Sequence, residues 1–292
     1  MPIRIDVALG DTVESSSATG TGSSSSIITD AERRTFSVDN DRLKDSLAVF
    51  MGKKPNDVFV RSPTPWNDLY ETYNWPQTER NTIVRSVQVL EVRIESETIR
   101  QRIINSGSRP APFPISFSRT VTNTVTSKWS NSQSISFGLK AEIKFGKVFQ
   151  VGIGASIEWR NTWGSEETVT ESVTVATGAG VSMILDPGEC AVIDATFKST
   201  EGIVRVEYES SLSGNVAMNY HPRYRGHHFF TSPTAAVMSR NDIANRHITT
   251  QTFGTKLHKE VILEVKDDET SETLRSFRSD LPLVADGPII LA

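Results

Sequence analysis

The residue types best suited to metal or catalytic chemistry are three histidines in one short stretch and a single cysteine. They are His221, His227, His228 and Cys190. A metal site usually needs three or four nitrogen, sulfur or carboxylate ligands, and the cysteine stands far from the histidines in the sequence. We therefore interpret the histidines as exposed loop residues, and we expect neither a metal nor any other cofactor.

Sequence motifs that carry enzymatic chemistry are missing from the chain. It contains no Gly-x-Ser-x-Gly, no His-Glu-x-x-His, no P-loop and no dinucleotide-binding fingerprint. The glycines of Gly152-Ile-Gly-Ala-Ser-Ile lie in a strand-like stretch with no helix after it, so they do not form a phosphate loop. The sequence predicts that the protein is not an enzyme.

The segment 134–160 favours another chemistry, insertion into a lipid bilayer. Apolar residues fill its odd positions on both sides of a central break: Ile135, Phe137, Leu139, Ala141, Ile143, Phe145, Phe149, Val151, Ile153, Ala155, Ile157 and Trp159. The polar residues between them, expected to line a pore, are Lys140, Glu142, Lys144, Gln150, Ser156 and Glu158. Such alternation predicts two strands with one apolar face. Each strand fits the roughly 9–11 residues of a transmembrane β-strand, and Trp159 suits a membrane rim.

The shared parity of the two strands predicts the turn between them. A two-residue loop would set apolar residues opposite polar ones, whereas a three-residue loop containing a glycine keeps one apolar face. The expected loop is Gly146, Lys147 and Val148. The expected pairs are Phe145 with Phe149, Ile143 with Val151 and Ala141 with Ile153.

The same register continues outward, into Ser/Thr-rich flanks at 118–127 and 167–177. It predicts Val121 opposite Val173, Thr124 opposite Thr170 and Val125 opposite Val169. These flanks are prone to form strands but too polar for a good core, so we expect a wall that is wet on both faces. An ordinary amphipathic hairpin on a soluble core would show the same alternation. Since one hairpin cannot close a barrel and open edges are not tolerated in lipid, several chains would each have to contribute one.

The N-terminal quarter predicts two further regions. Residues 1–35, rich in Ser and Gly, are expected to be a flexible tail, followed by a small helical and aromatic cap over 36–78. The cap should hold a helix over 39–52 and another that begins at Thr64-Pro65. Its aromatic residues fit either a packed cap or a site for a lipid headgroup or other ligand; they are Trp66, Tyr70, Tyr73 and Trp75.

Composition narrows the function classes. The chain has 292 residues, 37% hydrophobic and 23% charged, with a formal net charge of −4. This acidic balance gives no electrostatic basis for binding nucleic acid. We find no signal-peptide core and no run of about 18 apolar residues. The sequence therefore predicts a soluble protein, cytoplasmic or released by a non-Sec route, that inserts into a membrane when activated.

An ordered series of segments over about residues 80–210 resembles the aerolysin superfamily of β-pore-forming proteins, in particular its epsilon-toxin/Mtx2-like branch and intracellular eukaryotic relatives. The series runs from Asn105-Ser-Gly-Ser-Arg-Pro through the Ser/Thr strand beginning at Phe117, the amphipathic insert and the second Ser/Thr strand. It ends at Leu185-Asp-Pro-Gly-Glu, which leads into the strand from Ala191. Residues 1–78 and 215–292 match no family in this way.

The resemblance implies a mainly β fold, with an elongated, twisted, antiparallel module over 79–292. In such a module the pre-stem hairpin, at about 134–160, is tucked against the body and released on oligomerisation. The implied function is pore formation by a homo-oligomeric ring on a membrane, reached through a lipid or glycan receptor. The alternative is a non-lytic carbohydrate- or lipid-binding defence or storage protein on the same scaffold.

Overall fold

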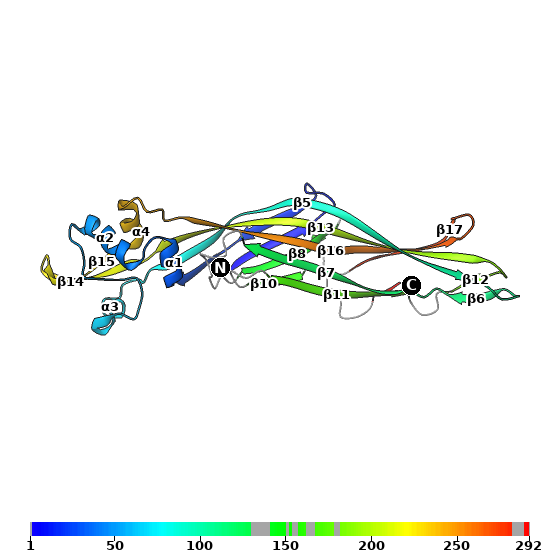
Figure 1. Ribbon diagram of the computed structural model, residues 1–292, viewed down its shortest axis with the longest axis horizontal. Coiled ribbons are helices and arrows are strands. Elements are labelled where there is room, and N and C mark those ends of the chain that lie inside the picture. Colours follow the sequence, from blue (N-terminus) through cyan, green and yellow to red (C-terminus); the bar gives the residue numbers. More distant parts are fainter. Residues whose placement is uncertain are drawn as a thin grey trace.

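The protein is long and narrow, with its helices gathered at one end (Figure 1). The structure, a computed structural model, describes residues 2–129, 141–149, 152–153, 157–161, 167–177, 182–281 and 289–291. The helices are α1 (Asp30–Thr35), α2 (Asn40–Met51), α3 (Pro65–Tyr73) and α4 (Thr234–Arg240). The strands are β1 (Ile3–Leu9), β2 (Ser17–Thr21), β3 (Ser23–Ile27), β4 (Asp57–Phe59), β5 (Glu79–Ile104), β6 (Ala111–Pro114), β7 (Ser118–Trp129), β8 (Ala141–Phe149), β9 (Gly152–Ile153), β10 (Ile157–Asn161), β11 (Glu167–Thr177), β12 (Ser182–Leu185), β13 (Cys190–Ser213), β14 (Asn215–Tyr224), β15 (His227–Pro233), β16 (His247–Asp267), β17 (Thr273–Asp280) and β18 (Ile289–Leu291).

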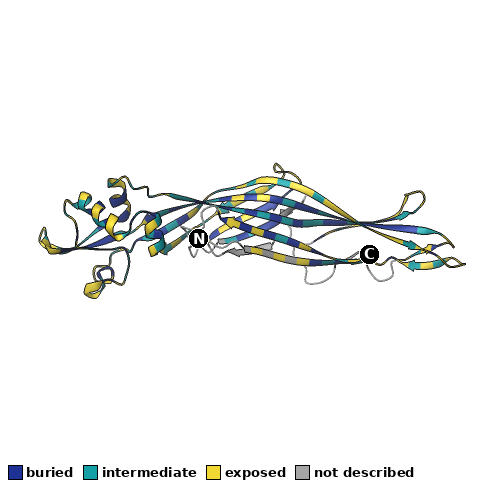
Figure 2. Ribbon diagram, viewed as in Figure 1, coloured by how far each residue is buried: buried dark blue, intermediate teal, exposed yellow. Residues whose placement is uncertain are grey.

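One large sheet forms the long axis of the molecule. Its strand order is β18-β11-β7-β16-β13-β5-β3, with β17 beside β16, and β5, β13 and β16 run through most of its length (Figure 1). Residues along β13 alternate between buried and partly or fully exposed from Gly202 to Leu212, as expected for a strand with one face on a core. Figure 2 shows the same alternation along the neighbouring long strands. The mainly β, elongated and antiparallel fold predicted from the sequence is confirmed.

A second sheet, in the order β10-β8-β1-β2, packs against the middle of the large one. Together the two sheets enclose an apolar core built from β1, β7, β8, β13 and β16. Its fully or almost fully buried side chains are Ile3, Ile5, Val7, Leu9, Val125, Trp129, Ile143, Phe145, Val204, Val206, Tyr208, Phe253 and Leu257. The second sheet is therefore a structural layer of the body.

The expectation of a flexible tail over residues 1–35 is wrong. This segment forms β1, β2, β3 and α1. The apolar side chains of β1 alternate and enter the core, and α1 starts with a capping box between Thr29 and Glu32. The Ser-rich β3 is ordered because it pairs with β5, from Ser23 opposite Ile83 to Ile27 opposite Glu79. Composition alone misled the prediction, since paired backbone needs no apolar side chains.

The helical end, here called the head, combines two separate parts of the sequence. The predicted helix over 39–52 is confirmed as α2, with Asp39 as its N-cap and Gly52 as a left-handed C-cap. Its buried Leu43 and Leu47 pack with Met218 and Val237, which come from β14 and α4. The head thus continues beyond the expected cap at 36–78, into a stretch of chain near residues 215–240.

Candidate functional site

Two apolar side chains of the predicted hairpin are buried inside the body. Ile143 and Phe145 on β8 are both 0% exposed, and the Phe145 ring lies 5.2 Å from that of Phe253 on β16. Between them Lys144 is half-buried. These two side chains, which the sequence predicts to meet lipid, therefore pack on protein in this structure.

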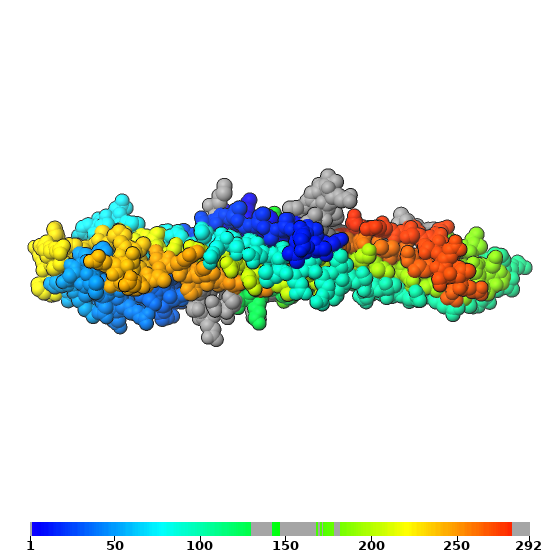
Figure 3. All heavy atoms as spheres, turned by 90° about the horizontal axis from the view of Figure 1, so that it is seen from above, coloured from blue at the N-terminus to red at the C-terminus, as the bar shows by residue number. Residues whose placement is uncertain are grey.

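β1 holds this strand from its side. It pairs with β8 in parallel, with Ile5 opposite Ile143 and Val7 opposite Phe145. On the other face of the pair, Arg4 Nε lies 3.4 Å from an oxygen of Glu142. The turn that follows β1 is tied to the large sheet by an ion pair between Asp11 and Lys259. In Figure 3 the N-terminal strands lie at the surface of the middle of the body, beside β5.

The predicted three-residue turn is wrong for this structure. Gly146, Lys147 and Val148 lie within β8, and Ala8 and Leu9 of β1 stand opposite the first two. β10 pairs with β8 so that Trp159, and not Val151, lies opposite Ile143. Parallel pairing with β1 keeps the backbone extended where a local reading of the sequence places a loop.

The flanking register, by contrast, is confirmed. β7 and β11 pair with Val125 opposite Val169 and Thr124 opposite Thr170. On their exposed face the hydroxyls of Thr120 and Thr174 lie 3.0 Å apart. The expectation that both faces of these strands are wet is wrong, because the other face of β7 is buried. There the Oδ1 of Asn123, a fully buried residue, accepts a hydrogen bond from the backbone N–H of His258 at 2.7 Å.

Several predicted hairpin and pore residues cannot be placed. Outside the described residues lie Ile135, Phe137, Leu139, Lys140, Gln150, Val151, Ala155 and Ser156. The strands β8, β9 and β10 contain Ala141, Phe149, Ile153, Ile157, Glu158 and Trp159. Among these, Glu158 stands opposite Lys144 and Ala141 opposite Asn161. The roles of all these residues in a membrane stay predictions.

The aromatic residues predicted for the cap separate into one core residue and an exposed group. Tyr70 is 3% exposed and donates its hydroxyl to the carbonyl oxygens of Phe59, at 2.8 Å, and Asn215, at 3.1 Å. Burial raises the pKa of Tyr70, so the phenol stays protonated and acts as a structural donor. Tyr70 is therefore not available to a receptor.

The other three rings meet a phenylalanine that the sequence analysis missed. Trp66 is 46% and Tyr73 47% exposed. Tyr73 stacks on Trp75 with ring centroids 4.7 Å apart, and Trp66 lies 5.1 Å from Phe229 of β15. We call Trp66, Tyr73, Trp75 and Phe229 the aromatic patch. Phe229 could have been found only by recognising β15, since it lies far from the others in the sequence.

The backbone at the start of α3 adopts an unusual conformation. Trp66, Asn67 and Asp68 have φ angles of 63°, 60° and 53°, in the left-handed region that residues other than glycine rarely adopt. Two side-chain acceptors support this turn: Thr64 Oγ1 accepts from the Leu69 N–H at 2.7 Å, and Asp68 Oδ1 from the Tyr70 N–H at 3.2 Å. Such strain often accompanies a functional surface, and here it lies in the segment that carries the exposed Trp66.

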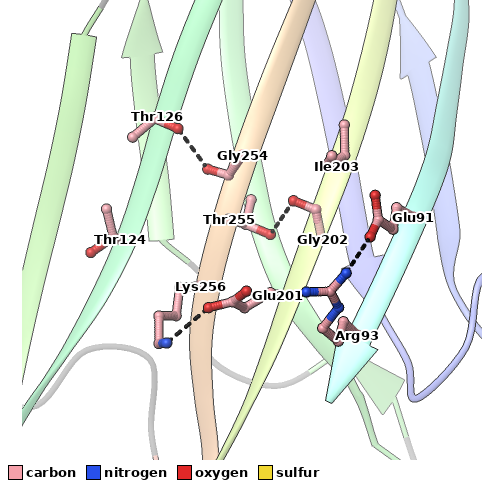
Figure 4. Close-up of a pocket in the computed structure, with 10 residues that line it drawn as sticks. All are labelled: Glu91, Arg93, Thr124, Thr126, Glu201, Gly202, Ile203, Gly254, Thr255 and Lys256. Carbon is pink, nitrogen blue, oxygen red and sulfur yellow. Dashed lines mark hydrogen bonds and ion pairs between the residues drawn. The ribbon is translucent and has the colours of Figure 1, made fainter. Parts of the chain in front are cut away.

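A shallow hollow of about 490 Å³ lies on the outer face of the large sheet (Figure 4). It lies over Gly254, where a Cβ would come within 2.9 Å of the Thr126 hydroxyl. Its lysine is already paired, since Lys256 Nζ lies 2.8 Å from Glu201 and 3.1 Å from Glu95. Hydrogen bonding to Glu201 raises the pKa of Lys256. This side chain therefore completes a structural ion-pair network and offers no free charge to a ligand.

The described residues include neither a cluster of metal ligands nor a helix that could span a membrane. There, no three His, Cys, Asp or Glu side chains gather as a metal site would require. In the same part of the chain, no helix has the length and apolar character needed to cross a bilayer.

Comparison with known proteins places this arrangement in a family. No protein-family model matches the chain. It is 30% identical over 247 residues to U-megalopygitoxin(8)-Mc8 of Megalopyge crispata, covering 82% of each chain. It is also 30% identical over 242 residues to U-megalopygitoxin(8)-Mo12 of Megalopyge opercularis, again covering 82% of each. These relatives are named as toxins, not as enzymes.

Among solved structures, the crystal structure of parasporin-2, a Bacillus thuringiensis toxin that recognises cancer cells, has a similar fold. It superposes with a TM-score of 0.60 at 19% identity, covering 89% of this chain and 98% of that one. The level of identity means that this likeness concerns the fold alone. The chain belongs to the megalopygitoxin family, and its elongated β fold agrees with the resemblance of its sequence to the aerolysin superfamily.

Proposed function

We propose that this protein binds a membrane through its head, assembles into a homo-oligomeric ring and inserts one hairpin per protomer, about 134–160, as part of a transmembrane β-barrel. The observation that best supports the proposal is the packing of β8 against the body. Its Ile143 and Phe145 side chains are buried on the body, in a sheet separate from the long strands, and one of its neighbours is the N-terminal β1.

The geometry of β1 and β8 requires a release step. Neighbouring strands of membrane β-barrels built from hairpins run antiparallel, whereas β1 and β8 are parallel. β1 must therefore leave β8 before the hairpin can join a barrel. The core then loses Ile143 and Phe145, whose burial stabilises the body by about 1.5–3 kcal/mol each. Contact with lipid offsets this loss, since the same two side chains are removed from water again.

The register must also change. In the structure Ile143 stands opposite Trp159, but a compact hairpin with a three-residue turn places Val151 there. The compact register brings the apolar residues of two nine- to eleven-residue strands to one face, at the length that spans a bilayer. The paired flanks, β7 and β11, already follow this compact register. The two strands of the inserted hairpin can therefore continue the pairing that β7 and β11 already have.

A non-lytic role is the second candidate. The aromatic patch is complete in the soluble form and needs no insertion, because Trp66, Tyr73 and Trp75 already lie together with Phe229. Amphipathic aromatic rings are suited to lipid headgroups and sugars. A protein that used only this patch would bind a membrane lipid or glycan without forming a pore.

A reversible disulfide between β1 and β8 separates the two candidates. Arg4 and Glu142 are opposite each other and partly exposed, so Arg4→Cys/Glu142→Cys in a Cys190→Ser background spares the core. We expect the oxidised protein to bind liposomes without releasing trapped dye, and leakage to return on reduction. The matched control, Arg4→Ser/Glu142→Ser, should leak under both conditions. Full leakage by the oxidised protein would refute release of β8 from β1, and absence of leakage from all variants would favour the non-lytic role.

A further inference from the structure

The outermost point of the head is the tight turn between β14 and β15. Tyr224 pairs with His227, and Arg225 and Gly226 between them have φ angles of 47° and 86°. Two central residues with positive φ make a two-residue hairpin turn, the type that matches the twist of its strands. Arg223 and Arg225 are both exposed here. The turn projects from the end of the long axis, shown in yellow at one extremity of Figure 3.

Three cations at this turn keep their charge available. Lys53, Arg223 and Arg225, here called the basic tip, make no ion pair with any carboxylate in the described part of the chain, although the neighbouring Lys54 pairs with Asp45. Aromatic rings hold two of them instead. Lys53 Nζ lies 5.4 Å, and the Arg225 guanidinium carbon 5.0 Å, from the centre of the Tyr224 ring. A ring face attracts a cation without neutralising it.

Hydrogen bonds fix the position of the basic tip. The Tyr224 hydroxyl donates to the carbonyl of Met51 at 2.8 Å, and the Tyr220 hydroxyl donates to the carbonyl of Lys53 at 3.1 Å. These bonds tie β14 to the end of α2, so Lys53 and the hairpin turn move as one unit. A preordered group of cations loses little side-chain freedom on binding.

His221 and His228 lie on the β14–β15 hairpin, between its turn and the level of Phe229. His228 packs with its ring centre 6.2 Å from that of Phe229, a member of the patch, and 6.0 Å from His221. Aromatic rings beside basic residues are the usual composition of surfaces that lie at the lipid headgroups. The exposed turn projects from the end of the molecule, so its shape suits a plane of headgroups.

We infer that the basic tip binds the phosphate-bearing headgroups of an anionic membrane surface and thereby orients the head toward the bilayer. This inference rests on the proposed function, which places the membrane at the head. Charge argues for a local site, because the whole chain carries a formal charge of −4 and would be repelled on average. Only a local excess of cations, such as the basic tip, gives attraction.

The test is vesicle flotation of the full chain with two lipid compositions, phosphatidylcholine alone and phosphatidylcholine mixed with phosphatidylserine. We expect the wild-type protein to prefer the mixed vesicles. Each basic residue near an anionic surface strengthens binding by about five-fold. Lys53→Gln/Arg223→Gln/Arg225→Gln should therefore weaken binding to the mixed vesicles on the order of 100-fold. It should leave binding to phosphatidylcholine unchanged and reduce the dependence on salt.

The control removes the same amount of charge away from the head. Arg109, Lys128 and Arg275 are exposed, so Arg109→Gln/Lys128→Gln/Arg275→Gln changes the net charge equally. Little effect of this control supports the inference, whereas equal losses in both triple variants would mean that only total charge matters and would overturn it. Equal binding of the wild type to both vesicles would also overturn it, as would capture by a sialylated glycan surface without any preference for phosphatidylserine.

Flotation measures binding without leakage. A protein that floats with anionic vesicles but never releases dye would contradict the proposed pore and leave the basic tip intact. Thermal unfolding of both triple variants, expected to match the wild type, shows that a loss of binding does not come from misfolding.

Discussion

β7 and β11 form a wall whose strands pair with each other over most of their length, while β8, here called the stored strand, pairs in parallel with β1 near the N-terminus. β7 has β11 on one side and β16 on the other. β8 has β10 on one side and β1 on the other. The wall and the stored strand are adjacent in sequence, but only the stored strand relies on a parallel partner near the N-terminus.

In the proposed function, the wall stays in place and the stored strand leaves the body. The wall belongs to the same sheet as the long strands and would be torn from β16 if it moved. The stored strand belongs to a smaller sheet, and removing β1 frees its edge. A segment held by a neighbour that can itself detach can open locally, while the rest of the protein stays folded.

The largest expected effect is a change in the pairing register of the stored strand between the soluble protein and the assembled pore. Ala141→Cys/Asn161→Cys should crosslink in the soluble protein, because these residues are opposite each other there. Ala141→Cys/Ile153→Cys should crosslink within one chain only in the assembled pore. Cross-strand Cβ atoms lie about 4.5–5.5 Å apart, close enough for a disulfide or a short crosslinker. We expect each pair to react in one state and not in the other.

Non-reducing gels before and after incubation with liposomes, in a Cys190→Ser background, provide the measurement. Crosslinking of Ala141→Cys/Asn161→Cys in assembled pores would show that the register does not change. Efficient pairing of position 141 with position 150 or 152 in pores would rule out the three-residue turn in the membrane.

A smaller but still large effect should distinguish core from wall in the soluble protein. Phe145→Ala removes a fully buried ring against Phe253, so the free energy of unfolding should fall by about 3–5 kcal/mol. Thr120→Ala removes only an exposed hydroxyl opposite Thr174, and the expected loss is about 0.2–1 kcal/mol. Urea denaturation measures both. Similar losses would mean that β8 is not a structural part of the body. Ile143→Arg should likewise damage the soluble fold, because Ile143 is 0% exposed.

The smallest expected effect is weak anion preference of the pore. If even positions line the lumen, Lys140 and Lys144 outnumber Glu142 in its midsection, and rings of cations favour anions. Glu158, Glu166 and Glu167 oppose this toward the other mouth. The preference should fade as salt shortens the Debye length from about 10 Å at 0.1 M.

Reversal potentials in a KCl gradient measure this preference, and Lys144→Gln should reduce it. Clear cation selectivity that survives Glu166→Gln/Glu167→Gln would mean that the lysines do not face the channel.

The sequence by itself determined features that depend on neighbours along the chain. Asp39 and Gly52 bound α2 as predicted, because capping is a local hydrogen-bond requirement. The register of β7 with β11, such as Val125 opposite Val169, followed from parity, since the side-chain period of a strand is two. The resemblance over about 80–210 predicted the elongated, mainly β fold.

Only the tertiary structure decided which distant segments meet. Nothing local to Gly146 indicates that β1 lies beside it, and that pairing converts an expected turn into extended strand. Phe229 joins Trp66 because β14 and β15 return to the head, and Arg225 reaches Lys53 through the ring of Tyr224 for the same reason. Pairing between residues far apart in sequence depends on which faces the folded chain leaves to be buried, and local patterning cannot specify it.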